Sequence, residues 1–384
     1  QNNFIGTDIN GESDRGNGND GIFLGEYIIG SHPNEPHGVS GAPSDTMIGG
    51  ISVNARNIIS GNDRDGVRIE AGTTKTFIQG NYIGLTQSGN GRLGNTGSGV
   101  AIIDSAGNTI GGVVDESVLD PHGLQAQMPR NVISANGDAG VRISGAASAD
   151  NHVQGNYIGT DKNGQTAVGA DGSPLGNTGA GVVIDDAGAS EVSGGVLVPG
   201  NMIGDTTTGG RNIISGNVGP GVFITGASKG NTVLGNYIGT DRLGDVAVPN
   251  GAGGVLLRVK EVLGIVGIPS ENTIGGDSVA ARNVISGNKR DGIQIAFGAS
   301  QNKMWGNFIG TKANGVDPLG NARHGVWIID SPDNTIGGLA FVPGDPRGNV
   351  ISANLGHGVY ISGSDATRNR VLGNIIGLDF TGSS

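Results

Sequence analysis

The sequence has 384 residues, of which 76 are glycine and none is cysteine, and a formal net charge of −11. The glycines follow no three-residue period and lie between short Val/Ile segments, which excludes collagen and argues against disorder. The acidic balance, without any Lys/Arg run, argues against nucleic-acid partners, and the longest apolar stretch, 262–268, is too short for membrane insertion.

Three predicted elements recur along the chain. GVxI strands start at Gly21, Gly66, Gly99, Gly140, Gly181, Gly221, Gly254, Gly292, Gly325 and Gly358, mostly 33 to 41 residues apart. NTIGG or a relative follows, and then a third segment that alternates between RNxISGN and GNYIGTD forms, as at 56–62 and 155–161. All three are four or five residues long with alternating inward and outward positions, which predicts three short strands per repeat.

Ten such repeats without a helical period predict an all-β fold, a right-handed parallel β-helix (β-solenoid) of about ten coils, as a single domain over 1–384. A β-propeller has a similar period, but its blades need four longer antiparallel strands. Both chain ends lie at a third-strand segment without capping structure, so we expect a segment of a longer array or a subunit that stacks head to tail.

The second residue of the third strand is asparagine in every repeat. Stacked in register, these amides can hydrogen-bond along the rod. The column runs through Asn3, Asn57, Asn81, Asn131, Asn156, Asn212, Asn236, Asn283, Asn307, Asn349 and Asn374. The next residue points outward and alternates between aromatic and aliphatic, as at Tyr157 and Ile213. We expect the following loops to fold back so that Leu93, Leu175 and Leu319 cover the rings.

These cassettes, NTIGG, RNVISGN, GVxI and GNYIGTD, resemble the right-handed parallel β-helix repeats of the pectin-lyase-like superfamily, especially those of large secreted bacterial surface proteins. The resemblance covers essentially the whole chain and implies the fold and a secreted or cell-surface location. It implies no single activity, because the superfamily includes lyases, hydrolases, epimerases, tailspikes and adhesins. No catalytic motif of the family can be matched residue by residue.

TDxxG turns follow several third strands, at Asp8, Asp161, Asp241 and Asp379. One carboxylate is too few for Ca²⁺, which takes six or more oxygen ligands, and another repeat carries Lys312 instead. We therefore interpret the aspartate as opening a tight turn that glycine closes, and expect no metal site and no cofactor. Weak calcium binding between the loops of adjacent coils is retained as the alternative.

The residue before GVxI forms a second column, because like positions of successive coils lie about 4.8 Å apart. In the last repeats, this column and the outward position of the same strands bring together Asp291, His324, His357, Gln294, Trp327 and Tyr360. A histidine could act as a general base with Asp291 orienting it, while Gln294 and the aromatic rings bind a sugar. The alternative, which we prefer to catalysis, is that the histidines cap turns on a solvated edge.

A charged group lies on the corresponding strands of the N-terminal half. Arg68 and Arg142 are two coils apart, roughly 10 Å, a spacing that suits successive carboxylates of an acidic polysaccharide. Glu70, Asp104 and Asp185 lie on the corresponding strands of the same half. We expect local acids to balance an exposed charged face, and keep both arginines as candidate carbohydrate-binding residues.

The sequence therefore predicts an extracellular structural or adhesive β-solenoid of a bacterial surface protein, whose partner is a polysaccharide, a cell-surface glycan or another copy of itself. The alternative is a carbohydrate-active enzyme, a polysaccharide lyase or epimerase, that acts through His324, His357 and Asp291 beside Trp327. The enzyme requires a groove walled by the loops at 112–129 and 164–179. The structural role predicts uniform repeats and no groove.

Overall fold

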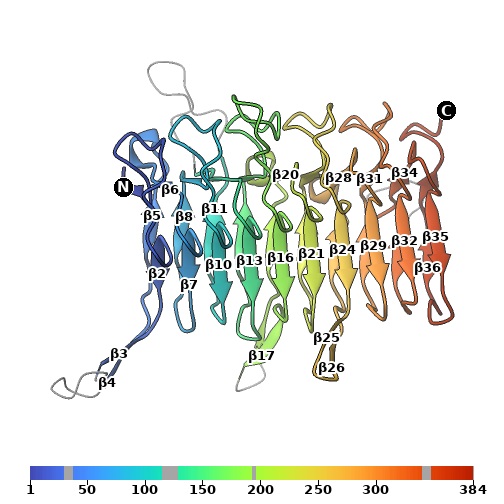
Figure 1. Cartoon of the computed structure of the whole chain (residues 1–384). Coiled ribbons are helices and arrows are strands. Elements are labelled where there is room, and N and C mark those ends of the chain that lie inside the picture. Colours follow the sequence, from blue (N-terminus) through green and yellow to red (C-terminus); the bar gives the residue numbers. More distant parts are fainter. Residues whose placement is uncertain (30–37, 115–128, 193–195, 340–346, 384) are drawn as a thin grey trace.

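The computed structural model describes residues 1–29, 38–114, 129–192, 196–339 and 347–383. Within these ranges, three parallel sheets run the length of a rod, and the chain visits them in the same order in every coil (Figure 1). Sheet 1 has eleven strands, and sheets 2 and 3 have ten each. This arrangement confirms the predicted coils of three short strands and excludes the antiparallel blades of a propeller.

Sheet 1 contains the third-strand segments: β1 (Phe4–Ile5), β6 (Ile58–Ile59), β9 (Tyr82–Ile83), β12 (Val132–Ile133), β15 (Tyr157–Ile158), β20 (Ile213–Ile214), β23 (Tyr237–Ile238), β28 (Val284–Ile285), β31 (Phe308–Ile309), β34 (Val350–Ile351) and β37 (Ile375–Ile376). Sheet 2 contains the GVxI strands: β2 (Ile22–Leu24), β7 (Val67–Ile69), β10 (Val100–Ile103), β13 (Val141–Ser144), β16 (Val182–Asp185), β21 (Val222–Thr225), β24 (Val255–Arg258), β29 (Ile293–Ala296), β32 (Val326–Ile329) and β35 (Val359–Ser362). Sheet 3 contains the NTIGG-like strands: β5 (Met47–Gly49), β8 (Phe77–Gln79), β11 (Thr109–Gly111), β14 (His152–Gln154), β19 (Met202–Gly204), β22 (Thr232–Leu234), β27 (Thr273–Gly275), β30 (Lys303–Trp305), β33 (Thr335–Gly337) and β36 (Arg370–Leu372).

Short insertions interrupt some coils. Antiparallel hairpins pair β3 (Tyr27–Ile29) with β4 (Gly38–Ser40), β17 (Ser190–Val192) with β18 (Val196–Val198), and β25 (Lys260–Val262) with β26 (Ile265–Gly267). They project from one side of the rod, opposite the long turns (Figure 1). The 3₁₀ helices are η1 (Val53–Ala55), η2 (Thr208–Gly210) and η3 (Val279–Ala281). In the described ranges, none of the helices has the length and apolar character needed to cross a bilayer.

The interior of the rod is filled by inward-facing Ile and Val side chains from all three sheets. Ile143, for example, lies in register between Ile102 and Ile184, and all three are fully buried. Columns of like side chains bury apolar surface continuously along the axis, because each coil covers the one before it. This packing explains how a chain with only 4% aromatic residues builds a core.

The predicted asparagine column is confirmed. Each side-chain amide donates to the Oδ1 of the next asparagine at 2.8 to 3.2 Å, from Asn3 to Asn374. We did not predict two further asparagine ladders, one at each of the other corners. They comprise Asn17, Asn62, Asn95, Asn136, Asn177, Asn217, Asn250, Asn288, Asn321 and Asn354, and Asn108, Asn151, Asn201, Asn231, Asn272, Asn302, Asn334 and Asn369.

The outward aromatic residues of sheet 1 are covered, as predicted, and they form a second apolar cluster outside the coils. Leu175 is fully buried in this cluster, whereas Leu93 and Leu319 are only half-buried and lie outside it. The main cover was missed by the sequence analysis. An arginine of the preceding coil stacks on four of these five rings at 4.0 to 4.2 Å, in the pairs Arg56–Tyr82, Arg130–Tyr157, Arg211–Tyr237 and Arg282–Phe308. The arginine and the ring belong to successive coils, so this surface repeats every two coils.

The TDxxG segments form the predicted turns. Asp161 Oδ1 accepts from the backbone N–H groups of Gln165 and Thr166 at 2.8 and 3.2 Å. The same kind of bond, from Glu12, lowers the pKa of the Asp8 carboxyl. In the described part of the chain, no group of three or more His, Cys, Asp or Glu side chains is placed to hold a metal ion. Weak calcium binding between loops stays a prediction.

Candidate functional site

The structure brings the predicted aromatic and histidine residues together on the outer face of sheet 2. Gln294, Trp327 and Tyr360 are directly opposite one another on β29, β32 and β35. The neighbours of Gln294 and Trp327 on β29 and β32 are buried in the core, and the same strand alternation and register place all three side chains outward. The Trp327 and Tyr360 rings stack with centroids 6.0 Å apart and planes inclined by 22°.

The two histidines lie beside these rings. The His324 and His357 imidazoles are parallel, with centroids 5.2 Å apart, and the Tyr360 ring lies 4.9 Å from His324 and 5.3 Å from His357. The Trp327 and His324 rings are arranged edge to face, with their centroids 5.9 Å apart. His357 and Tyr360 are exposed, and His324 and Trp327 are half-buried. We call Trp327, Tyr360, His324 and His357 the aromatic cluster.

The column before the GVxI strands has a structural use that we did not predict in detail. His324 donates its backbone N–H to Asp291 Oδ1 at 3.1 Å, and His357 donates its backbone N–H to His324 Nδ1 at 2.9 Å. Because Nδ1 of His324 accepts a hydrogen bond, the neutral imidazole carries its proton on Nε2. The Asp291 carboxylate therefore accepts from the main chain of His324. Among these described residues, no hydrogen bond joins this carboxylate to the imidazole ring.

Electrostatics keep His324 neutral. Burial lowers the pKa of the His324 imidazole below its ordinary value of about 6.5. The carboxylate of Asp291 acts in the opposite direction, while Arg323 and His357 lower the pKa further. Arg323 lies 3.7 Å from the Asp291 carboxylate and places its guanidinium 4.9 Å from the Trp327 ring. At neutral pH the cluster therefore presents the uncharged His324 imidazole beside aromatic faces.

Two contacts hold Trp327 in place. Its Nε1 donates to the Ser362 hydroxyl at 3.0 Å, and the Arg323 guanidinium lies over its ring. Ser362 was absent from our candidates, although it is the outward residue two positions after Tyr360 on β35. A tryptophan fixed at its polar edge presents a pre-ordered apolar face, which lowers the entropy cost of stacking a ligand on it.

Of the two loops that the enzyme hypothesis requires, only the 164–179 loop is fully described, and it does not lie beside this cluster. Residues 115–128 of the first loop lie outside the described ranges. The 164–179 loop hydrogen-bonds to Asn90 and Ala135 in the N-terminal half, so it does not form a wall beside β32.

The surface of the rod is also not free of hollows, whereas the structural role predicted none. One of about 730 Å³ lies on sheet 3, where the short Thr335 separates Lys303 from Arg370.

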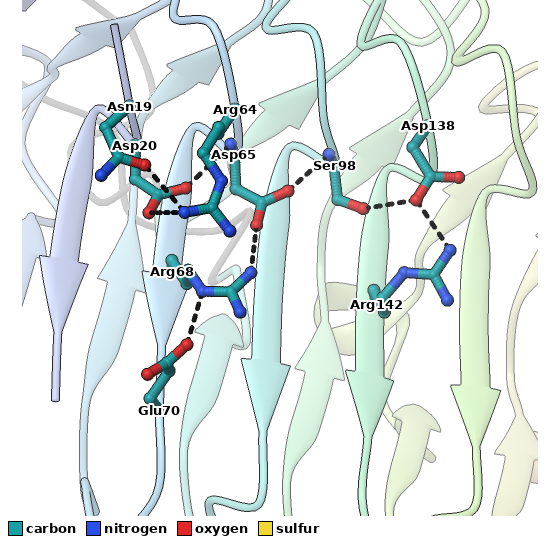
Figure 2. Close-up of polar contacts among 9 residues, drawn as sticks. All are labelled: Asn19, Asp20, Arg64, Asp65, Arg68, Glu70, Ser98, Asp138 and Arg142. Carbon is teal, nitrogen blue, oxygen red and sulfur yellow. Dashed lines mark hydrogen bonds and ion pairs between the residues drawn. The ribbon is translucent and has the colours of Figure 1, made fainter. Parts of the chain in front are cut away.

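Arg68 and Arg142 lie apart from the aromatic cluster, in the N-terminal half of sheet 2, two strands from each other (Figure 2). Arg68 pairs with Asp65 at 2.9 Å and with Glu70 at 2.7 Å. Arg142 pairs with Asp138 at 2.7 Å. Local acids therefore balance both arginines, as expected, while their use as carbohydrate-binding residues stays a prediction.

Figure 2 also shows the turn-capping column at the N-terminal end. Asp20 Oδ1 accepts the backbone N–H of Asp65 at 3.0 Å, and Asp65 Oδ1 accepts that of Ser98 at 2.7 Å. Asp291 and His324 do the same at the other end of the rod. This position therefore caps turns in both halves, and the histidines are distinguished by their rings, which stack on each other and on Tyr360.

Neither a family model nor a curated protein sequence matches this chain. The fold class is decided by three parallel sheets that the chain enters in a fixed order. The protein is a right-handed parallel β-helix. Asparagine ladders at its corners and short strands at a constant register recur in successive coils of this β-helix.

Several solved structures are similar to this β-helix. A mutant of the periplasmic alginate epimerase AlgG matches with a TM-score of 0.39 and 14% identity, covering 84% of this chain and 72% of that chain. The A-module of the Azotobacter vinelandii mannuronan C-5 epimerase AlgE4 matches at 0.28 and 13%, covering 84% of each. The Dettilon tailspike protein matches at 0.34 and 17%, covering 85% of this chain and 60% of that chain. Likeness at this level carries no argument about activity.

Proposed function

We propose that the protein is an extracellular structural or adhesive β-solenoid that binds a polysaccharide through the aromatic cluster. The observation that supports this most is the stacked Trp327–Tyr360 pair, set in register on a rigid sheet with two imidazoles beside it. Rigid, flat, partly apolar faces with polar neighbours suit the apolar faces and hydroxyl groups of sugar rings. A secreted or cell-surface location accompanies this proposal.

Replacing Trp327 by alanine is expected to weaken polysaccharide binding at least tenfold, because the alanine variant loses the largest apolar face of the cluster. Binding is measured by affinity electrophoresis and calorimetry against a panel of neutral and acidic polysaccharides. Phe223→Ala is the matched control, since Phe223 occupies the same outward register position on β21 and lies far from the cluster. Equal binding by wild type and Trp327→Ala would contradict the proposal, as would a wild type that binds none of the panel.

A carbohydrate-active enzyme, a lyase or epimerase, is the second candidate. It is favoured by the His324 imidazole, whose lowered pKa leaves it neutral and able to accept a proton. Asp291 fixes the backbone of His324, and the His357 N–H occupies Nδ1. Because Nε2 already carries the proton of the neutral ring, His324 accepts a proton at Nδ1 once the His357 N–H releases that atom.

For this candidate, His324→Ala is expected to abolish the formation of unsaturated or epimerised product. The base must be neutral and its pKa lies below the usual value, so the rate should rise with pH and be half-maximal below about pH 6.5. His152→Ala, on sheet 3, is the control. Wild-type protein that leaves every polysaccharide of the panel unchanged would remove this candidate, without affecting binding by Trp327.

A further inference from the structure

A pocket of about 280 Å³ on the outer face of sheet 1 is distinct from the aromatic cluster. It is lined by Arg130, Arg211, Arg242, Tyr157, Tyr237 and Ile213, with Thr208 and Leu243 at its edge. Ile213 lies in register between the two tyrosines, and all three side chains are buried. The pocket therefore has an apolar floor between two rings and cationic walls.

Two of the guanidinium groups are held in fixed positions. Arg130 stacks on Tyr157 at 4.2 Å and donates its Nε–H to Gly155 O at 3.1 Å. Arg211 stacks on Tyr237 at 4.0 Å and donates its Nε–H to Gly235 O at 3.1 Å. In both, the ring and the carbonyl fix the plane of the guanidinium group, so its terminal N–H groups are pre-oriented donors.

The third guanidinium group belongs to Arg242, in the turn after β23, two coils beyond the strand that carries Tyr157. The backbone N–H of Arg242 bonds to Gly164 O at 2.8 Å, which places the 239–244 turn against the preceding turn and sets Arg242 beside the pocket. The equivalent position is Lys162 in the preceding turn and Ala313 in the following one. The backbone N–H of each of these residues likewise bonds to a glycine carbonyl of the turn before it. The three-arginine arrangement thus depends on this one repeat.

The pocket carries uncompensated positive charge. Among the described residues, no acidic side chain lines it and none of its three arginines forms an ion pair. Several other surface arginines of this acidic protein do form ion pairs, among them Arg68, Arg142 and Arg368. Three unpaired guanidinium groups around one small hollow repel one another, and a bound anion would relieve that repulsion.

We infer that this pocket binds an oxyanion, either as a free inorganic ion or as the charged group of a small acidic sugar. Planar guanidinium groups donate in a geometry that matches carboxylate, sulfate and phosphate oxygens. The volume of about 280 Å³ suits a small ligand more than a polymer segment. The inference goes beyond polysaccharide binding on sheet 2, because it concerns another sheet and another ligand chemistry.

The test is calorimetric titration of the full 384-residue chain with sulfate, inorganic phosphate and glucuronate, with glucose as the neutral control. We expect at least one oxyanion to bind and glucose not to bind. Arg242→Ala is expected to weaken that binding tenfold or more. This variant reproduces the alanine that the next turn already carries, so its fold, checked by circular dichroism, should be unchanged. Which anion binds most tightly distinguishes an inorganic ion from an acidic sugar.

Lys162→Ala is the matched control, because it removes a cation from the same position of the preceding turn without touching the pocket. It should bind the anion as the wild type does. Any of three results would overturn the inference. The wild type binds no oxyanion, Arg242→Ala still binds it, or Lys162→Ala and Arg242→Ala lose binding equally. Trp327→Ala should leave anion binding intact, so this result and the polysaccharide result fail or succeed separately.

Discussion

Asn156→Leu is expected to lower the free energy of unfolding by about 4 kcal/mol or more, since each buried polar group left without a partner costs about 1–3 kcal/mol. Asn156 is fully buried; its Nδ2 donates to Ile110 O at 2.8 Å and to Asn212 Oδ1 at 3.1 Å. Its Oδ1 accepts from both the backbone and the side-chain amide of Asn131. Leucine has a similar volume, so the loss reports on hydrogen bonds more than on packing.

Asn163→Leu is the matched control, because Asn163 is exposed in the turn that follows the same strand. It should change the free energy of unfolding by less than about 0.5 kcal/mol. Urea unfolding followed by circular dichroism gives both values, and hydrogen exchange locates the weakened coils, since coils of a solenoid are coupled mainly to their neighbours. Equal stability of Asn156→Leu and wild type would show that the ladder contributes nothing.

Gly159→Ala is expected to cost about 3 kcal/mol, from left-handed backbone strain and from overpacking against the next coil. Gly159 ends the GNYIG segment with a φ of +95°, and a Cβ there would overlap Ser215 O and lie 2.5 Å from Asn217 Oδ1. The substitution therefore pushes apart two coils and disturbs the second asparagine ladder. Thermal and urea unfolding should both shift.

Gly172→Ala separates the two causes. Gly172 has a φ of +84°, but nothing lies within 4 Å of a Cβ built on it. Its replacement should therefore cost only the backbone strain, about 1 kcal/mol. If Gly159→Ala costs no more than Gly172→Ala, the close approach of successive coils at Gly159 does not constrain the sequence.

The coil and its register could be predicted because every strand repeats and the side-chain period of a strand is fixed. One asparagine ladder followed from the same reasoning. The ladders through Asn62 and Asn108 were missed because each of these residues follows a glycine and lies within three residues of a serine, in a composition typical of turns. Their positions in the corners, where the backbone leaves a sheet and its polar groups need partners, become evident only when the coils are stacked.

The composition of the aromatic cluster was predictable, but the hydrogen bonds within it were not. Register alone placed Trp327 beside Tyr360. That Asp291 binds the backbone of His324, and not its ring, depends on where the chain turns before each strand. Likewise, the arginine of each RN segment was interpreted only as part of a repeat, because a linear pattern does not show that it lies over a ring of the following coil.

The alternation of arginine and ring on sheet 1 determines how a rod of this kind can change length. Removing or duplicating a single coil would put two arginine-bearing coils, or two ring-bearing coils, next to each other, and the stacked turns would lose their partners. Removing or duplicating two coils would rejoin matching surfaces. Gene duplications that are retained in such an array should therefore add coils in even numbers.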